Sequence, residues 1–466
     1  TDRFLTSWGV KQAVDVEQPA RVKIRGIKLD IMDQQMSKSQ KVRIQYASKY
    51  ARVSNYWKYF IGQSEQLVKN KVFDKKQNIE NSFTSWYQEK ELDETYSQAL
   101  SLIQNSIESS SKYTIPKVYF QEGVVGSELI LFMLRNIGTR APLYRAISSG
   151  EGIKDAKDNL IKAAEAFYKD YNATIDENTL AAILSLYSND VPKEFQPDIL
   201  ISLNNKYKGD FKKFASNYFE KSPFKSYELF KTWLYNDKLS IKMIEKDLVY
   251  KLMTQFLDVY RTKVMMPQSS FDSDYKKGMR LFVDGLQKSG MNKASDANST
   301  MRFTYGNVLP YDPADAVHYD FYTTLEGVMQ KEVVTDNKNH EFYVPQKLKD
   351  LFNAKDFGPY ARKEDGKLPV GFLSNNDITG GNSGSPVINA HGELIGTAFD
   401  GNWEAMSGDI YFEPNIQRTI SVDIRYSLFI IDKYAGAKHL IDEMNVITDR
   451  HDELKPEIMA NPVQEN

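Results

Sequence analysis

The nine residues Thr-Gly-Gly-Asn-Ser-Gly-Ser-Pro-Val at positions 379–387 have the composition of a loop that presents a nucleophilic serine. Gly381 permits backbone angles that a side chain would forbid, so the N–H groups of Gly381 and Ser383 can point at one spot and form an oxyanion hole. Gly384 keeps the far side of Ser383 open, and Pro386 directs the chain into an apolar strand. The same residue types also build ordinary surface turns. The doubled glycine, followed by a strand and a hairpin, favours a catalytic serine.

A serine hydroxyl is a poor nucleophile until a neighbouring base, itself oriented by a carboxylate, removes its proton. The chain has five histidines, and none of them precedes position 318. They stand near the start of the C-terminal part, in polar turns, on a terminal helix and in the polar tail: His318, His340, His391, His439 and His451. None of these surroundings is typical of a catalytic base. We therefore expect the catalytic histidine and aspartate to be missing from this chain.

The overall composition excludes several other classes of protein. The 466 residues carry 60 basic and 62 acidic side chains, and the net charge of −2 gives no basis for a nucleic-acid partner. Cysteine is absent, so disulfides and thiolate metal sites are excluded; no metal or cofactor is expected. No apolar run reaches the roughly 18 residues that would span a membrane. The chain begins at Thr1 without methionine, which indicates a processed product or a fragment.

The first part of the chain is predicted to be an α-helical domain of residues 1–295. Apolar positions recur at helical spacing along segments such as 158–171 and 180–187. Asp176 or Asn178 is expected to cap the second of these helices. We interpret the domain as a cap that gates the access of substrate to a neighbouring cleft.

The second part, residues 296–450, has the β-branched and aromatic content of an antiparallel β domain. Strands are expected at 302–305, 321–326, 328–332, 387–388, 393–399 and 421–424. Residues 426–434 fit a strand or a helix, 437–445 fit a closing amphipathic helix, and the tail 451–466 is expected to be flexible. The predicted fold class is α+β: a large α-helical domain followed by an antiparallel, chymotrypsin-like β-barrel half with a C-terminal helix.

Three further segments are as distinctive as the Ser383 turn: MRFTYGNV at 301–308, YTTLEG at 322–327 and FDGNWE at 399–404. Together they resemble the bacterial dipeptidyl-peptidase 7/11 family, and the resemblance runs over nearly the whole chain. This family comprises serine exopeptidases with a chymotrypsin-like double barrel and a large inserted helical domain. The resemblance implies release of N-terminal dipeptides from oligopeptides, a homodimer, and a periplasmic or secreted location in a bacterium. It also implies that the catalytic His and Asp lie upstream of Thr1.

Three residues acquire roles through this resemblance. Asp400 is similar to the family aspartate that holds the free α-amine of the substrate; an amine anchored at a fixed distance from the scissile bond explains dipeptide release. A surface acid in a turn is the alternative for Asp400. Gly401 stands where the acid-preferring branch carries arginine, which implies a broad or hydrophobic preference for the residue before the scissile bond. Asn55 resembles an asparagine that helps to bind the amine, although an ordinary helix asparagine fits the sequence equally well.

Two other functions are compatible with the sequence. A chain without the catalytic His and Asp fits a catalytically inactive fragment that binds peptide N-termini. The Gly-Asn-Ser-Gly-Ser-Pro sequence at 381–386 is also similar to that of glutamyl endopeptidases, which cleave inside peptides. The large helical domain favours the exopeptidase, because a cap that closes one end of a cleft suits removal of residues from a chain end.

Overall fold

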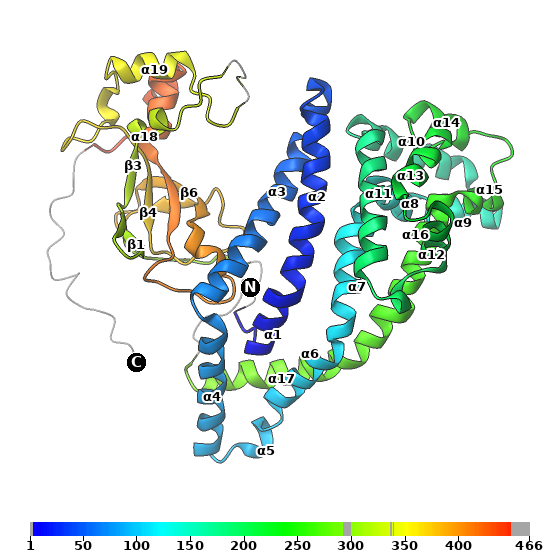
Figure 1. Ribbon diagram of the computed structural model, residues 1–466. Coiled ribbons are helices and arrows are strands. Elements are labelled where there is room, and N and C mark those ends of the chain that lie inside the picture. The colour runs from blue at the N-terminus through cyan, green and yellow to red at the C-terminus, as the bar shows by residue number, and fades with distance from the viewer. Residues whose placement is uncertain (1–2, 292–299, 336–337, 339, 449–466) are drawn as a thin grey trace. The chain divides into compact units, whose positions relative to one another are not determined.

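The computed structural model describes residues 3–291, 300–335, 338 and 340–448. The chain forms two compact units: a helical unit of Thr1–Thr300 with Asp409–Tyr411, and a β unit of Met301–Gly408 with Phe412–Asn466. It is mostly helical, with small antiparallel sheets (Figure 1). The predicted boundary at 295/296 and the predicted flexible tail 451–466 lie outside the described residues. None of the described helices is both long enough and apolar enough to cross a membrane.

The helical unit is built from helices joined by short turns. Its α-helices are α1 (Ser7–Gln12), α2 (Gln18–Met36), α3 (Gln40–Lys69), α4 (Val72–Glu89), α5 (Asp93–Tyr96), α6 (Ala99–Ser110), α7 (Thr114–Val118), α8 (Glu128–Asn136), α9 (Pro142–Ser149), α10 (Ile153–Lys169), α11 (Ala173–Asp190), α12 (Asp198–Tyr207), α13 (Phe211–Lys221), α14 (Tyr227–Leu234), α15 (Ile241–Lys246), α16 (Leu248–Val259) and α17 (Met266–Lys288). Short π and 3₁₀ segments are η1 (Ala13–Glu17), η2 (Ser111–Tyr113), η3 (Tyr119–Gly123), η4 (Val124–Gly126), η5 (Lys193–Phe195) and η6 (Tyr260–Met265).

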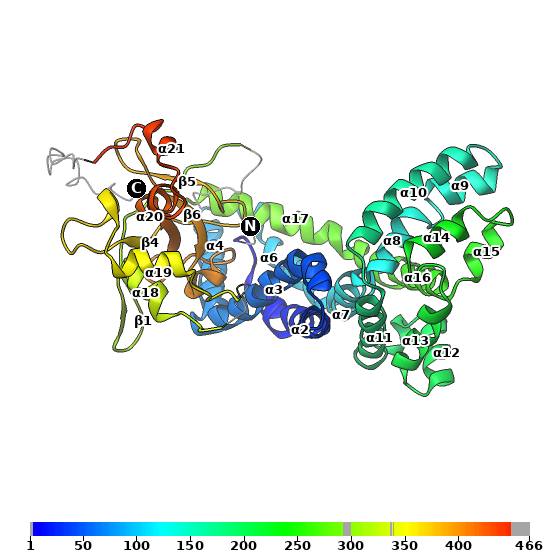
Figure 2. The same cartoon turned by 90° about the horizontal axis from the view of Figure 1, so that it is seen from above.

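Two of the π segments continue helices rather than end them. η1 joins α1 to α2, and η6 joins α16 to α17, so that one helical rod runs from Leu248 to Lys288. Pro267, near the start of α17, has no N–H to donate, and the wider π turn directly before it accommodates the interrupted hydrogen-bond ladder. α17 lies alongside α6 in both views of the molecule (Figures 1 and 2).

Aromatic side chains dominate the largest core of the helical unit, which is formed mainly by α8, α10, α11, α13, α14 and α16. Phe214, Phe230 and Phe256 are at most 1% exposed there, and full burial of such a side chain contributes about 1.5–3 kcal/mol. A smaller cluster joins Ile410 to Val10, Leu67 and Val72. The segment Asp409–Tyr411 thus belongs to the helical unit, although its neighbours in sequence belong to the β unit.

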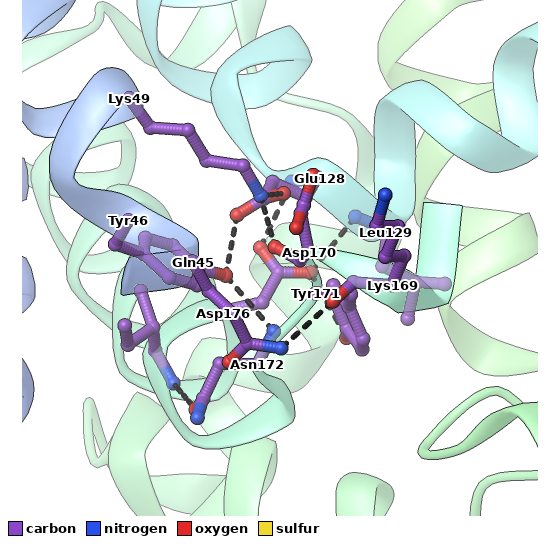
Figure 3. Close-up of polar contacts among 11 residues, drawn as sticks. Gln45, Tyr46, Lys49, Glu128, Leu129, Lys169, Asp170, Tyr171, Asn172 and Asp176 are labelled. Atoms are coloured by element: carbon purple, nitrogen blue, oxygen red, sulfur yellow. Dashed lines mark hydrogen bonds and ion pairs between the residues drawn. The ribbon is translucent and has the colours of Figure 1, made fainter. Parts of the chain in front are cut away.

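A buried carboxylate connects three helices of the helical unit (Figure 3). Asp176, on α11, accepts hydrogen bonds from the N–H groups of Glu128 (2.9 Å) and Leu129 (2.8 Å) at the start of α8. The Glu128 carboxylate in turn accepts from the hydroxyl of Tyr46 on α3 at 2.7 Å. The prediction that Asp176 or Asn178 caps its own helix is therefore wrong. Asn172 caps α11, because it is the residue directly before the first helical turn and its side chain accepts from Ile175 N–H at 3.1 Å.

The β unit contains an open antiparallel sheet with the strand order β3-β4-β7-β6-β5, and a separate two-stranded hairpin. The strands are β1 (Tyr311–Ala314), β2 (Val317–Tyr319), β3 (Tyr322–Thr324), β4 (Pro369–Ser374), β5 (Pro386–Ile388), β6 (Leu394–Gly401) and β7 (Thr419–Asp423). Within the described residues no sheet closes into a barrel, since β3 and β5 each have one neighbour only. The predicted strand at 302–305 is wrong, because these residues belong to neither sheet.

Helices cover part of the β unit: α18 (Leu325–Gln330), α19 (Gln346–Asn353), α20 (Ile424–Phe429), α21 (Lys438–Asp442), η7 (Gly358–Tyr360), η8 (Trp403–Ser407) and η9 (Ile430–Tyr434). The predicted strand 328–332 is wrong: α18 occupies this position because Leu325, fully buried, packs in a core with Leu348 and Phe429. The segment 426–434, for which strand and helix were both compatible, is helical. The closing helix α21 is shorter than the predicted 437–445.

Replacement of Asp176 by Asn is expected to change how stability depends on pH. Burial, and then the nearby charge of Glu128, raise the pKa of Asp176 from 3.8 to about 6. The folded protein therefore keeps a proton that the unfolded chain has released, and Asp176 lowers the stability by about 3 kcal/mol as pH rises from about 4 to about 6. Asp176→Asn cannot titrate, so the variant should gain about that much relative to wild type between pH 4 and pH 7. Urea unfolding of both proteins measures this; a pH-independent difference would contradict it.

Candidate active site

The turn around Ser383 has the backbone conformation that its glycines predict. Gly381 has φ +103° and Gly384 has φ +84°, both in the region that L side chains rarely adopt. Ser385 N–H donates to the Asn382 carbonyl at 2.9 Å, and the Asn382 side chain accepts from Thr379 N–H at 3.1 Å. These bonds close the turn upon itself and leave the Ser383 side chain exposed.

The N–H groups predicted to form an oxyanion hole are not used within the turn. Among the residues that the structure describes, no acceptor receives a hydrogen bond from Gly381 N–H or Ser383 N–H. A backbone donor without a partner is normally satisfied by water or by a ligand. The two groups are therefore available to a developing negative charge on a bound carbonyl oxygen.

Two neighbouring segments hold the turn in place. On one side, Gly384 N–H donates to the Ala398 carbonyl of β6 at 2.7 Å, and Ala398 N–H donates to the Ser385 carbonyl at 3.0 Å. On the other side, Arg302 donates to the Thr379 hydroxyl at 3.1 Å, and Thr304 Oγ1 accepts from Asp377 N–H at 3.0 Å. The chain at 302–305 thus contacts the turn, and the residue two positions before it, through side-chain hydrogen bonds.

The Ser383 hydroxyl donates to the carbonyl of Phe399 at 3.2 Å, its only polar contact within the described residues. Phe399 is a bulge in β6: Ala398 pairs with Ser421, and Asp400 already pairs with Ile420. His318, in contrast, is paired with Asp312 at 2.7 Å on the exposed β1–β2 hairpin. The structure therefore places no described histidine in hydrogen-bond contact with Ser383; that the base lies outside this chain stays a prediction.

Asp400 and Gly401 end β6 directly after this bulge. The Asp400 side chain is exposed, and one of its oxygens accepts from Gly401 N–H at 2.8 Å. Its other oxygen has no partner in the described part of the chain, so it can accept from an ammonium group. The β unit thus contains four of the five predicted site residues: Ser383, Gly381, Asp400 and Gly401.

Asn55, the fifth predicted residue, is exposed on α3 of the helical unit. Its amide makes no hydrogen bond to any residue that the structure describes. The ring of the adjacent Tyr56 is half exposed and lies under the Arg25 guanidinium, 5.3 Å from the ring centroid. Across the described ranges, no three His, Asp or Glu side chains are grouped as metal ligands would be.

The hydrogen bonds that hold the loop after Gly401 could not be predicted from the sequence. Asn402, 5% exposed, donates its N–H to the Arg418 carbonyl (2.9 Å) and accepts from Arg418 N–H through its side chain (2.9 Å). Among the described residues, the buried Arg418 guanidinium donates only to main-chain carbonyls, including those of Pro310 (2.8 Å) and Pro414 (2.7 Å). Burial lowers the pKa of Arg418. The segment FDGNWE at 399–404 was a signal for Asn402; nothing pointed to Arg418.

An apolar cavity of about 460 Å³ lies in the β unit. The sheet contributes Phe372, Phe399 and Val422, and Tyr311 of the β1–β2 hairpin and Tyr426 of α20 complete the wall. Phe399 connects this cavity to the turn, because its carbonyl accepts from Ser383.

Comparison with known proteins finds one matching family model, Peptidase S46, over residues 1–446. A dipeptidyl-peptidase 7 of Phocaeicola vulgatus is 42% identical over 462 residues, which cover 96% of this chain and 61% of the relative. An Asp/Glu-specific dipeptidyl-peptidase of Flavobacterium psychrophilum is 38% identical over 451 residues, with 96% and 61% covered. The chain thus spans about three fifths of the length of these relatives.

Solved structures agree with the sequence comparison. The Porphyromonas endodontalis DPP11 in complex with the dipeptide Arg-Glu is similar to this chain with a TM-score of 0.84 at 33% identity, over 95% of this chain and 62% of that one. The same protein in an alternate conformation gives a TM-score of 0.67 at 32% identity, with 95% and 61% covered.

Gly381→Ala is expected to strain the turn, because a methyl group at φ +103° costs about 1–3 kcal/mol. Gly380→Ala is the matched control: Gly380 has no positive φ and no atom within 4 Å of an added Cβ. Differential scanning calorimetry of the full chain should show a lower melting temperature for Gly381→Ala. For Gly380→Ala the free energy of unfolding should change by less than about 0.5 kcal/mol. Equal stability of both variants would mean that the turn does not have this conformation in solution.

Proposed function

The chain belongs to the peptidase S46 family, and we propose on this basis that it is the nucleophile-bearing part of a serine dipeptidyl peptidase acting on oligopeptides. The observation that carries the proposal is the Ser383 turn, with an exposed hydroxyl beside two N–H groups that no described residue engages. The relatives named as dipeptidyl peptidases and the dipeptide complexes of the solved neighbour support the same reaction for this chain.

In the proposed reaction, Ser383 Oγ attacks the carbonyl carbon of the second residue of the peptide. The carbonyl oxygen becomes an oxyanion that the N–H groups of Gly381 and Ser383 stabilise. The hydroxyl proton passes to a base and then to the leaving amine, and water later releases the dipeptide from the acyl-enzyme. Because Ser383 contacts only the Phe399 carbonyl within the described residues, we assign the base and its orienting acid to the part of the relatives that this chain does not span.

Asp400 is the proposed anchor for the free α-amine of the substrate. Asp400 directly follows Phe399, whose carbonyl accepts from Ser383, and its carboxylate is exposed. One of its carboxylate oxygens accepts no hydrogen bond from the described residues. An ammonium–carboxylate bond at this point would hold a peptide by its N-terminus and fix the bond to be cleaved at two residues' distance. Asn55, exposed on α3, is the proposed second acceptor for the amine.

The pocket for the residue before the scissile bond is proposed to accept aliphatic and aromatic side chains, because Gly401 contributes no charge to it. A preference for Asp or Glu is the second candidate. It is supported by the Asp/Glu-specific relatives and by the Arg-Glu and Arg-Asp complexes of the solved neighbour. The glycine at position 401 favours the first candidate, since a buried substrate carboxylate needs a cation to pair with.

We also propose that the open sheet is part of a chymotrypsin-like barrel that the rest of the protein completes. Along β7, the polar residues Thr419, Ser421 and Asp423 are buried, whereas Ile420 and Val422 are only half buried and line the cavity. In an antiparallel sheet with one solvent-exposed face, the apolar residues are usually the buried ones and the polar residues the exposed ones. The reversed burial along β7 supports a further part of the protein that packs on Ile420 and Val422. A homodimer and a periplasmic or secreted location are further proposals, which rest on the resemblance alone.

The reaction is tested with the longest natural polypeptide that contains this sequence. Peptides with a free N-terminus should lose dipeptides, and Ser383→Ala should lower kcat by about 10⁴-fold or more with little change in KM. The same peptides with a blocked N-terminus should not be cleaved. Cleavage of blocked peptides would favour the endopeptidase, and binding without cleavage by the wild-type protein would favour the inactive peptide-binding protein.

Asp400→Asn should lower kcat/KM for free-amine peptides by about 10- to 100-fold, because a hydrogen bond to a charged group is worth about 1.5–3 kcal/mol. Glu443→Gln, which also removes an exposed acid of the β unit, is the control and should leave kcat/KM unchanged. If both variants behave alike, the amine is held elsewhere.

A further inference from the structure

Gly401 differs from the two glycines of the Ser383 turn in the reason for its presence. Gly381 and Gly384 have positive φ angles, and nothing lies within 4 Å of a Cβ added to either. Gly401 is the last residue of β6, pairs with Thr419 and has no positive φ. Its backbone would therefore accept any L residue.

Space, rather than backbone conformation, restricts position 401. A Cβ added to Gly401 would lie 2.9 Å from the Cβ of Ala405, closer than two carbon atoms approach without repulsion. The next atom, the Arg418 carbonyl oxygen, is at an ordinary 3.8 Å. A single methyl group, that of Ala405, thus occupies the place where a side chain at 401 would begin.

Ala405 cannot easily withdraw, because both ends of its turn are hydrogen-bonded. Its N–H donates to the Asn402 carbonyl at 2.9 Å, and its carbonyl accepts from Gly408 N–H at 2.8 Å. Ser407, one residue before Gly408, is itself held by the Gln417 amide at 3.0 Å. A Cβ moves only with its backbone, so these bonds oppose relief of the contact.

The base of the loop is held as firmly. The Asn402 amide donates to the Ile416 carbonyl (2.8 Å) and to the Glu404 carboxylate (3.0 Å), and the residue bonds twice to the Arg418 backbone. Asn402, Glu404 and Arg418 are each no more than 7% exposed. The loop that carries Ala405 is therefore a rigid wall beside Gly401.

We propose that Ala405 is a specificity-determining residue, because its methyl group limits position 401 to glycine. Residues 401 and 405 together then decide which substrate side chain is accepted in the proposed pocket for the residue before the scissile bond. This inference rests on the proposed function for its consequence for substrates, but not for its steric part. An arginine at 401 requires glycine at 405, because only the loss of that methyl group makes room for the new Cβ and for the cation that pairs with an acidic substrate residue.

The steric part is tested by a cycle of Gly401→Ala and Ala405→Gly, measured by thermal unfolding of the full chain. Gly401→Ala alone should lower the melting temperature by roughly 3–6 °C, since one extra methyl group overpacks a rigid site. In the Ala405→Gly background the same change should have almost no effect. If the two effects are simply additive, Ala405 does not restrict position 401 and the inference is wrong.

The specificity part is tested by calorimetric binding of the dipeptides Arg-Glu and Arg-Leu to the longest natural polypeptide that contains this sequence. In the double variant Gly401→Arg with Ala405→Gly, the ratio of affinities for Arg-Glu and Arg-Leu should be at least about tenfold higher than in wild type. Gly401→Arg alone should raise this ratio less and should have a lower melting temperature. Equal gains for the single and double variants would overturn the role of Ala405. If wild type and all variants bind neither dipeptide, the proposed function itself fails, whatever the unfolding cycle shows.

Discussion

The positive-φ backbone conformation of Gly381 and Gly384 is the constraint on which the rest of the site depends. Because both backbones adopt positive φ, Ser383 stands at the exposed tip, and the N–H of Gly384 is directed back to the Ala398 carbonyl. That bond fixes the turn to β6, so the position of Asp400 relative to Ser383 follows from the strand. A single local conformation therefore sets the position of the nucleophile, its hydrogen-bond donors and the residue proposed to hold the substrate amine.

Glycine serves two different physical ends along this short stretch of chain. At 381 and 384 it is needed for backbone conformation, and open space surrounds it. At 401 the conformation is ordinary and the space is taken by Ala405. The conformation around the nucleophile Ser383 is thus determined by nearby residues. The proposed substrate-selecting position 401 depends instead on the loop of Ala405, which Arg418, distant in sequence, holds in place.

This difference explains how much could be predicted from the sequence. The Ser383 turn was predictable because its requirement is local and shows as a run of glycines. The predicted strand at 328–332 is wrong because Leu325 packs in a core with Leu348 and Phe429. These contacts join residues far apart in the chain, so the local sequence pattern does not reveal them. The prediction that Asp176 or Asn178 caps its own helix is wrong, because the Asp176 oxygens accept hydrogen bonds from the N–H groups of residues 128 and 129. Ala405 carried no signal, since an alanine in a loop suggests no chemistry.

The segment Asp409–Tyr411 has a consequence for the order of events during synthesis. Ile410 is 2% exposed in a cluster with Val10, Leu67 and Val72, so residues near the start of the chain share their core with one made hundreds of residues later. A ribosome that has finished all the helices of the helical unit has still not supplied this side chain. The cluster is therefore incomplete until translation has passed Ser383, and the emerging chain keeps an apolar gap in its first helices until then.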